Sequence, residues 1–215
     1  MRFCPREQLR REPFKARSPF LLRSNPYFLA YRRRWGPDQE LWYERQLTLS
    51  LNRTNKRVLL HFGAVDWEAE VWVNGIRAGS HQGGFDGFSI DISDLLIKGE
   101  KQTIRVRVWD PSDAGPQPRG KQVQNPKGIW YTPVTGIWQT VWLEAVPIQH
   151  ITAVTSRTDW ENKNLIFTPE IQSNRQDLTV QISVTDTQGF SETKSAKVGE
   201  PIQIHVPNPK PWSPG

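Results

Sequence analysis

The stretch Gly128-Ile129-Trp130-Tyr131-Thr132-Pro133-Val134-Thr135-Gly136-Ile137-Trp138-Gln139-Thr140-Val141-Trp142-Leu143-Glu144 decides the fold of this chain. It contains two Gly-Ile-Trp triplets eight residues apart, the first leading into a proline-bearing turn and the second into an alternating run. Residues 137–146 are rich in β-branched and aromatic side chains, which predicts a β-strand. Four aromatic rings fall within 13 residues. They either fill a core between two sheets or present a flat apolar surface on which sugar rings stack.

The composition favours many short strands joined by turns. The 215 residues include 17 Pro, 15 Gly, ten Trp and nine Phe, and long apolar runs of helical period are few. The aromatic residues supply enough buried area for a core although only 36% of the chain is hydrophobic. A single cysteine, Cys4, excludes an intrachain disulfide and a cysteine-based metal site.

The positive charge is concentrated at the beginning of the chain. Residues 1–36 hold ten Lys or Arg against two acids, a net of +8 against +6 for the whole chain, so the remaining residues carry −2. Repeated prolines break any long helix there. The run Arg32-Arg33-Arg34 is compatible with a nucleic-acid arm or an organellar targeting segment, but we expect a disordered tail. We find no signal peptide and no membrane span, so the sequence as it stands predicts a cytoplasmic protein without a membrane partner.

Alternating apolar and polar residues predict strands at residues 41–49, 56–64, 68–74, 76–80, 88–92, 102–109 and 137–146. Asn74-Gly75 supplies the pair that a type I′ hairpin requires, and Ser93 is expected to cap one helical turn. Residues 110–127 form a long polar loop of the kind that is functional or disordered.

Beyond Pro147 the pattern changes to four runs, at residues 149–156, 164–172, 177–186 and 201–206, with turn-like spacers. This spacing is typical of an immunoglobulin-like sandwich, which normally takes about 100 residues. Only 68 residues follow Pro147. The sequence therefore predicts a truncated immunoglobulin-like domain.

A series of motifs between residues 41 and 146 resembles the N-terminal sugar-binding domain of glycoside hydrolase family 2, the family of β-galactosidases, β-glucuronidases and β-mannosidases. In chain order the motifs are Trp42-Tyr43-Glu44-Arg45, Leu60-His61-Phe62-Gly63-Ala64-Val65-Asp66, Val71-Trp72-Val73-Asn74-Gly75, His81-Gln82-Gly83-Gly84-Phe85, Phe88-Ser89-Ile90-Asp91-Ile92, and residues 135–144. The remainder is similar to the start of the family's immunoglobulin-like second domain, which typically ends in a Pro-x-Trp-Ser-Pro element like residues 210–214. The resemblance implies an all-β chain with a jelly-roll sandwich at residues 37–146 and a truncated immunoglobulin-like sandwich at 147–215. The basic segment at residues 1–36 is atypical of the family.

The resemblance also implies a function. The family hydrolyses β-glycosides with two glutamates on a third domain, a TIM barrel. The chain has no strand–helix alternation and no Asn-Glu pair, the local sequence that usually contains the acid. We therefore assign no catalytic residue and expect a chain that is inactive alone: the non-catalytic N-terminal portion of a β-glycosidase. Its expected partners are a carbohydrate and the catalytic barrel.

In some relatives the first domain contributes an acidic side chain to the sugar subsite, at the position that Thr140 occupies here. We name five candidate carbohydrate-binding residues. Gln139 and Thr140 offer neutral hydrogen bonds, Trp130 and Tyr131 offer stacking surfaces, and Asp86 offers an acceptor on a glycine-rich loop. Contact with the missing barrel is the alternative role of each.

Other function classes find little support. The four histidines are scattered without metal-ligand spacing, and neither a nucleophile elbow nor a phosphate loop is present, so we expect no metal and no cofactor. A freestanding carbohydrate-binding module is the second hypothesis. Nucleic-acid binding through residues 1–34 is the third, and the acidic remainder argues against it. The abrupt change of charge also suggests that residues 1–35 come from a shifted reading frame or a miscalled start, and the chain from a gene fragment.

Overall fold

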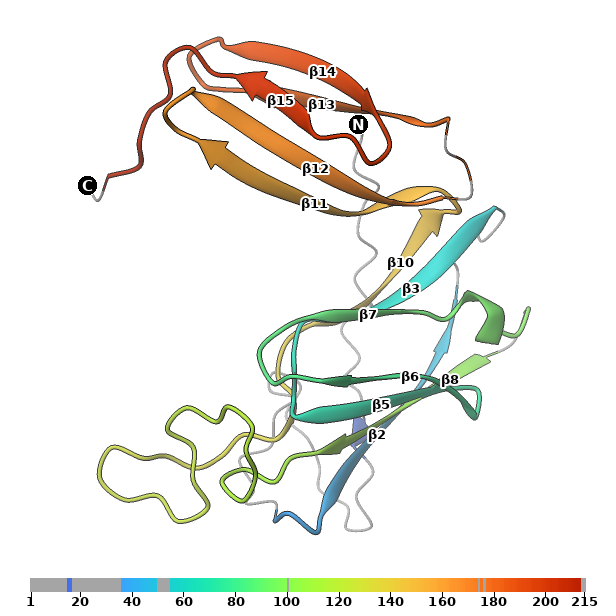
Figure 1. Cartoon of the computed structure of the whole chain (residues 1–215). Helices are drawn as coiled ribbons and strands as arrows, with labels where there is room; N and C mark the ends of the chain where they lie inside the picture. The colour runs from blue at the N-terminus through green and yellow to red at the C-terminus, as the bar shows by residue number, and fades with distance from the viewer. Residues whose placement is uncertain are drawn as a thin grey trace. The chain divides into compact units, whose positions relative to one another are not determined.

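Strands dominate the folded chain, as the alternating sequence predicted. The computed structural model describes residues 36–49, 55–99, 101–173, 175 and 177–213, together with the backbone of Lys15–Ala16. It contains two compact units, the first ending at Val146 and the second beginning at Pro147 (Figure 1). The basic segment of residues 1–36, with its predicted disorder, lies outside the described residues apart from Gly36 and that short strand. No helix within the described ranges has the length and apolar character needed to span a membrane.

One layer of the first unit is a five-stranded sheet whose neighbouring strands run antiparallel. Apolar and polar residues alternate along these strands, so the apolar side chains share the face that packs against the core. Leu41 and Tyr43 lie opposite Val108 and Val106, and all four are buried. In spatial order its strands are β1 (Lys15–Ala16), β2 (Glu40–Thr48), β8 (Lys101–Trp109), β5 (Glu68–Val73) and β6 (Ile76–Gln82).

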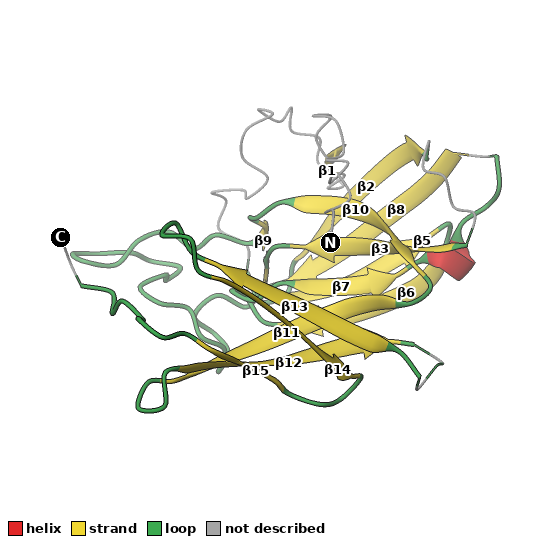
Figure 2. Cartoon of the chain, turned by 90° about the horizontal axis from the view of Figure 1, so that it is seen from above, coloured by secondary structure: helices red, strands yellow, loops and turns green. Residues whose placement is uncertain are grey.

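The facing layer combines a three-stranded sheet with a two-stranded one. The first has the order β10 (Val141–Pro147), β3 (Lys56–Phe62), β7 (Phe88–Asp91), and the second pairs β4 (Val65–Asp66) with β9 (Gly136–Ile137). Val58, Leu60 and Phe62 of β3 point into the core, as their alternation predicted. Apolar residues of both layers form one buried cluster, so the first unit is a β-sandwich, whose strands can be followed in Figure 2.

The strand predicted at residues 137–146 is interrupted. β9 ends at Ile137, residues 138–140 leave the strand, and β10 begins at Val141. The indole Nε1 of Trp138 donates to the carbonyl oxygen of Gly84 at 2.7 Å, and the carbonyl of Thr140 accepts from the amide of Gly63 at 2.8 Å. These tertiary contacts replace the regular ladder, and the sequence pattern did not reveal them.

The predicted hairpin at Asn74-Gly75 is confirmed. Both residues have positive φ, 52° and 84°, and they join β5 to β6. The Asn74 amide group also holds neighbouring segments: Nδ2 donates to the carbonyl of Leu95 and to Oε1 of Gln102, and Oδ1 accepts from the amide of Thr103. The single turn η1 (Ser93–Leu95) follows β7, but Ser93 does not cap it, because the N-cap position is Ile92 and no side chain bonds there.

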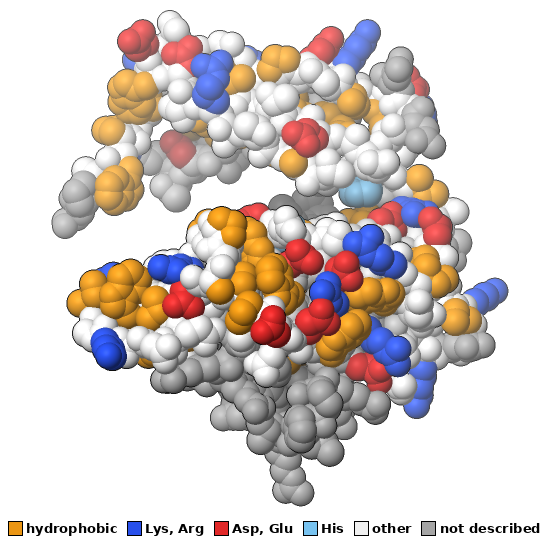
Figure 3. All heavy atoms as spheres, turned by 60° about the horizontal axis from the view of Figure 1, so that its bottom comes forward, with side chains coloured by type: hydrophobic (Ala, Val, Ile, Leu, Met, Phe, Trp, Pro, Cys, Tyr) orange, Lys and Arg blue, Asp and Glu red, His pale blue; other side chains and the backbone are white. Residues whose placement is uncertain are grey.

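The outward face of the five-stranded sheet carries ion pairs around two stacked tryptophans. Arg107 is paired with Glu40 on β2 and with Glu70 on β5, and the rings of Trp42 and Trp72 stack at 5.3 Å. Figure 3 shows hydrophobic side chains between acidic and basic ones on the visible face of this unit. Solvated ion pairs contribute about 1 kcal/mol or less each, so the buried cluster is the main source of stability.

The second unit is built from five strands within the described residues. One sheet has the order β11 (His150–Asp159), β12 (Asn164–Gln172), β15 (Ile202–His205), and β13 (Thr179–Thr185) pairs with β14 (Ser191–Lys197). Its buried core is small and centres on Val180, Ile202 and Ile204. β14 was not predicted because its sequence, Ser-Glu-Thr-Lys-Ser-Ala-Lys, is almost entirely polar. The all-β fold class is confirmed.

Gly136 is expected to be essential to the first sandwich. Its φ is +108°, and an added Cβ would lie 2.1 Å from Oη of Tyr43, which is buried and accepts from the amide of Ile137. Gly136→Ala should lower the free energy of unfolding by about 1–3 kcal/mol more than Gly99→Ala does. Gly99 also has positive φ, +76°, but open space around it, so it controls for backbone strain. Equal losses for the two variants in urea unfolding followed by circular dichroism would contradict the steric argument.

Candidate carbohydrate-binding site

Several loops of the first sandwich meet around the carboxyl group of Asp66. Asp66 ends β4 and pairs with Gly136 of β9, and its side chain is only 6% exposed. Gly84 lies so close that an added Cβ would be 2.5 Å from Oδ1 of Asp66. Because Trp138 also binds the carbonyl of Gly84, the loop at residues 83–87 is held from two sides.

A second buried carboxylate, that of Asp110, fixes the start of the long loop. Oδ1 of Asp110 accepts from the amide of Ser112, and Oδ2 accepts from Oγ1 of Thr135, both at 2.7 Å. Asp110 follows β8 and Thr135 precedes β9. This carboxylate therefore joins the two ends of the whole connection between β8 and β9. The predicted loop of residues 110–127 is therefore packed on the sandwich at its beginning.

The pKa of the Asp66 carboxyl group departs from its ordinary value. Burial, reinforced by repulsion from Asp110, raises the pKa of Asp66 to about 7, and a hydrogen bond with the Gln122 side chain opposes the rise. Oε1 of Gln122 accepts from the amide of Val134. Gln122 thus connects the middle of the long loop both to Asp66 and to the segment that leads into β9.

Exposed aromatic side chains lie on segments that also contact or adjoin this buried centre. Phe85 and Trp138 are 54% and 40% exposed and meet edge to face, with ring centroids 6.2 Å apart. Trp130 and Tyr131 are 42% and 55% exposed on a turn that is closed by a bond from the Trp130 amide to the carbonyl of Lys127. Large rings left in solvent on an ordered surface are typical of a binding face.

The five predicted binding residues all lie at the surface of this region. Asp86 is exposed, and its Oδ2 lies 3.5 Å from Nε2 of His81. The side chains of Gln139 and Thr140 are exposed, and Trp130 and Tyr131 belong to the aromatic turn. Their roles in binding a sugar stay predictions.

The connection between these residues runs through the buried centre. Tyr131 is joined to the strand-like segment at residues 121–123 by two backbone hydrogen bonds. Gln122 in that segment bonds Asp66, and Asp66 packs against Gly84 beside Asp86. The turn that carries Tyr131 is thereby positioned relative to the loop that carries Asp86.

Sequence reasoning missed four contributors to the site. Phe85 and Trp138 stood within quoted motifs but were not named as candidates, although a tryptophan just before an exposed Gln-Thr pair was a usable signal. The sequence signal for Asp66 and Asp110 was weaker, because each is an acid at the end of an apolar strand. Only their burial in the folded structure makes them unusual. Among the described residues, no three His, Cys, Asp or Glu side chains are grouped so as to hold a metal ion.

A family model described as "Glycosyl hydrolase 2 galactose-binding domain-like" matches residues 24–136, more than half of the chain. The first unit is thus of the class of galactose-binding-like β-sandwich domains. The chain belongs to the glycosyl hydrolase 2 family, which confirms the resemblance seen in the sequence.

Curated relatives are considerably longer than this chain. A protein of Formosa agariphila, provisionally assigned as a β-glucuronidase, is 34% identical over 180 residues, which cover 80% of this chain and 21% of the relative. The β-glucuronidase of Felis catus is 26% identical over 206 residues, covering 83% of this chain and 31% of the relative. The chain therefore spans about a fifth to a third of the length of these relatives.

Solved structures agree with the fold. A β-glucuronidase of Faecalibacterium prausnitzii superposes with a TM-score of 0.63 at 25% identity, covering 85% of this chain and 33% of that one. The likeness extends over most of the chain and so includes parts of both units.

The raised pKa of Asp66 makes a testable contribution to stability. Between its ordinary value of 3.8 and about 7, the folded state keeps a proton that the unfolded state releases, so this group lowers the free energy of unfolding as pH rises through that window. The full effect is roughly 4 kcal/mol at most. Asp66→Asn cannot ionise, so its stability relative to the wild type should increase from pH 4 to pH 8.

Urea unfolding at a series of pH values measures this difference directly. Asp38→Asn, which changes an exposed carboxylate elsewhere in the unit, serves as the matched control and should track the wild type. Parallel curves for Asp66→Asn and the wild type across this range would rule out a buried proton on Asp66.

Proposed function

We propose that this chain is the non-catalytic N-terminal portion of a β-glycosidase, whose first unit supports the catalytic barrel and helps to hold the carbohydrate. The observation that carries the proposal is the set of exposed rings, Phe85, Trp130, Tyr131 and Trp138, on loops that also contact or adjoin the buried carboxyl group of Asp66. Aromatic faces of this kind stack on the C–H faces of sugar rings. The relatives' names point to β-glycosides, and glucuronides are the first substrates to test.

The carboxyl groups of the site do not serve as a hydrolytic pair. Retaining glycosidases place two carboxyl groups on either side of the scissile bond, about 5 Å apart. Asp66 has the raised pKa of an acid catalyst, but it and Asp110 are 6% and 4% exposed. Both are engaged inside the fold, Asp110 with Ser112 and Thr135. We propose that hydrolysis by the intact enzyme proceeds with two carboxylates of the barrel, and that the first unit positions loops around them.

Binding and hydrolysis by the chain itself test the proposal. We expect no release of 4-nitrophenol from its β-D-glucuronide or β-D-galactoside, and weak binding of the matching methyl glycosides in saturation-transfer NMR. Trp130→Ala and Phe85→Ala should each weaken that binding about five- to tenfold, because each removes one stacking surface. Ile97→Ala, which removes an exposed apolar side chain outside the loops, should have no effect. Turnover by the purified chain, or binding indifferent to both aromatic variants, would contradict the proposal.

A freestanding carbohydrate-binding module is favoured by the same exposed aromatic residues. The two functions differ in affinity, because a module that acts alone must hold its glycan without a barrel. A dissociation constant of about 10 μM or lower for the isolated chain would favour the module, and one of about 1 mM or higher the supporting role. Nucleic-acid binding rests on residues 1–34, which are outside the described residues apart from β1.

A further inference from the structure

Four buried polar side chains line a narrow hollow at the start of the loop that follows β8. They are two carboxyl groups, a hydroxyl group and an amide group: Asp66, Asp110, Ser112 and Gln117. Their exposed fractions are 6%, 4%, 2% and 7%. Oxygen atoms of these four side chains are thus concentrated in one enclosed place.

Two of these oxygen atoms have no hydrogen-bond partner among the described residues. They are Oγ of Ser112 and Oε1 of Gln117, and both atoms are buried. Buried polar atoms in native proteins nearly always have a partner, and an atom without a protein partner points to a bound water or ion. The two oxygens therefore indicate that the hollow holds a ligand that accepts electron pairs from oxygen.

A water molecule is too large to be that ligand. The hollow leaves no room for a sphere of the size of water, and a buried water also needs two to four polar partners at hydrogen-bond distance. Oxygen ligands approach calcium to about 2.3–2.6 Å, whereas a hydrogen bond between two oxygens is about 2.8 Å long. A bare cation therefore fits a space from which water is excluded.

The loop itself holds the two unpartnered oxygens beside the carboxyl groups. Oδ1 of Asp110 accepts from the amide of Ser112, and Nε2 of Gln117 donates to the carbonyl of Ser112, both at 2.7 Å. Gly115 leaves the space that Gln117 occupies, because an added Cβ would lie 2.1 Å from Oε1. Since Nε2 is already engaged, Oε1 is the atom of Gln117 that remains for a ligand.

The charge of the hollow favours a cation. Asp66 and Asp110 both line it, and repulsion from Asp110 adds to the effect of burial on Asp66. Arg119 lines it too, but its Nη1 donates to the carbonyl of Asp113 at 2.9 Å. Within the part of the chain that the structure describes, no ion pair joins Arg119 to either carboxyl group. Two acidic groups thus share the hollow without a basic partner.

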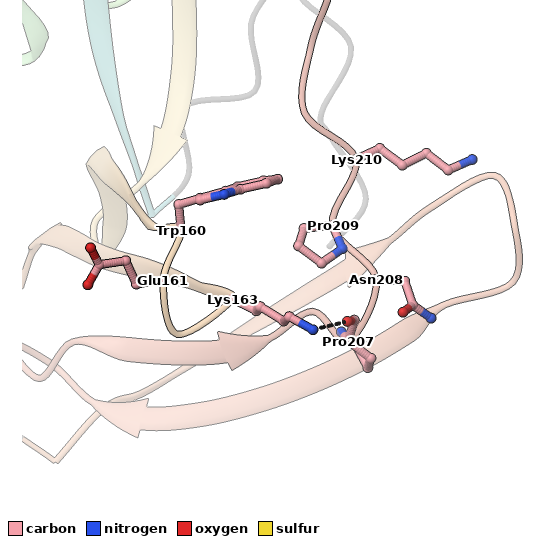
Figure 4. Close-up of a pocket in the computed structure, with 7 residues that line it drawn as sticks. All are labelled: Trp160, Glu161, Lys163, Pro207, Asn208, Pro209 and Lys210. Atoms are coloured by element: carbon pink, nitrogen blue, oxygen red, sulfur yellow. Dashed lines mark hydrogen bonds between the residues drawn. The ribbon is translucent and has the colours of Figure 1, made fainter.

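The wider pocket of the second unit offers no comparable signal. It lies between the turn that joins β11 to β12 and the segment that follows β15 (Figure 4). Nζ of Lys163 donates to the carbonyl of Pro207 at 3.2 Å, and the side chain of Lys210 points away from the gap. None of the unpartnered buried side-chain atoms of the described residues lines this pocket. The narrow hollow of the first unit is therefore the stronger candidate for a ligand.

We propose that this hollow binds a calcium ion through the side-chain oxygens of Asp66, Asp110, Ser112 and Gln117. Calcium takes six to eight oxygen ligands in flexible geometry, whereas magnesium demands a near-ideal octahedron and usually keeps several waters. The expectation of no metal rested on histidine spacing and a lone cysteine, and calcium requires neither residue. The ion joins β4 to the loop after β8, whether or not the exposed rings bind a sugar.

Thermal melting of the whole chain tests the proposal. The protein is freed of metal with EGTA, dialysed, and heated with calcium chloride or with sodium chloride of equal ionic strength. A site with two carboxylates should have a dissociation constant of about 0.1 mM. Roughly 5 mM calcium should then raise the melting temperature by about 5 °C. The same concentration of magnesium should raise it by less than about 1 °C.

Ser112→Ala gives the sharpest variant, because the hydroxyl has no hydrogen bond to lose. Without metal its melting temperature should equal or exceed that of the wild type, and its affinity for calcium should fall about tenfold. A purely structural hydroxyl would show the opposite: lower stability without metal and an unchanged calcium effect. Ser80→Ala, which removes an exposed hydroxyl of β6, is the matched control and should keep the full calcium effect.

Asp66→Asn and terbium give a second, independent measurement. The variant removes a charged ligand, so calcium should no longer raise its melting temperature. Terbium shares the preference of calcium for oxygen ligands. The indoles of Trp67 and Trp109 adjoin the two carboxyl groups in the sequence and can transfer excitation to a terbium ion bound between them. We expect this emission in the wild type, its displacement by calcium, and its loss in Asp66→Asn.

Three results overturn the proposal. The first is a melting temperature that calcium does not change. The second is an equal calcium effect in the wild type, Ser112→Ala and Asp66→Asn, which would place the ion elsewhere on the chain. The third is a destabilised Arg119→Gln together with a wild type indifferent to calcium, which would make the guanidinium group the counterion of the two carboxyl groups. Loss of sugar binding with an intact calcium effect bears on the proposed function alone.

Discussion

Burial of the Asp66 carboxyl group is the constraint on which the loop end of the first sandwich depends. A buried carboxyl group is stabilised by hydrogen-bond donors or by protonation. Here Gln122 provides a hydrogen bond, and a pKa of about 7 allows Asp66 to carry a proton near neutral pH. Gly84 approaches this carboxyl group closely, Gln122 bonds it, and Gly136 pairs with the backbone of Asp66, so three segments far apart in sequence meet at one residue. These contacts help to position the loops that carry the exposed rings.

The strand pattern was the most predictable part of the structure, for a physical reason. Apolar alternation is a local property, and Val58, Leu60 and Phe62 point into the core as their spacing requires. The Asn74-Gly75 turn is equally local, since both residues accept positive φ. Prediction failed where the partner is distant: the break after Ile137 depends on bonds to Gly84 and Gly63.

The exposed residues of the candidate site could be predicted from the sequence, but the buried carboxyl groups beneath its loops could not. Trp130 and Tyr131 could be named because aromatic residues beside Gly and Pro suggest a presented surface, and both are exposed. Asp66 and Asp110 could not be named, because an acid at a strand end is ordinary until three separate loops enclose it. Their interaction is a property of the assembled sandwich. β14 was missed for the opposite reason: its strand is specified by pairing with β13 and not by its own polar sequence.

The Asn74-Gly75 turn has a consequence for the chemical lifetime of the protein. Asparagine followed by glycine is the sequence most prone to deamidation, because the glycine amide attacks the side-chain carbonyl with little steric hindrance. In the fold, Nδ2 of Asn74 is bound to Leu95 and Gln102, and Oδ1 is bound to Thr103. Conversion to aspartate would replace two donors by an acceptor facing the carbonyl oxygens of Leu95 and Gln102. These hydrogen bonds protect Asn74 from deamidation while the hairpin is closed. Each opening of β5 and β6 exposes Asn74 to this irreversible reaction.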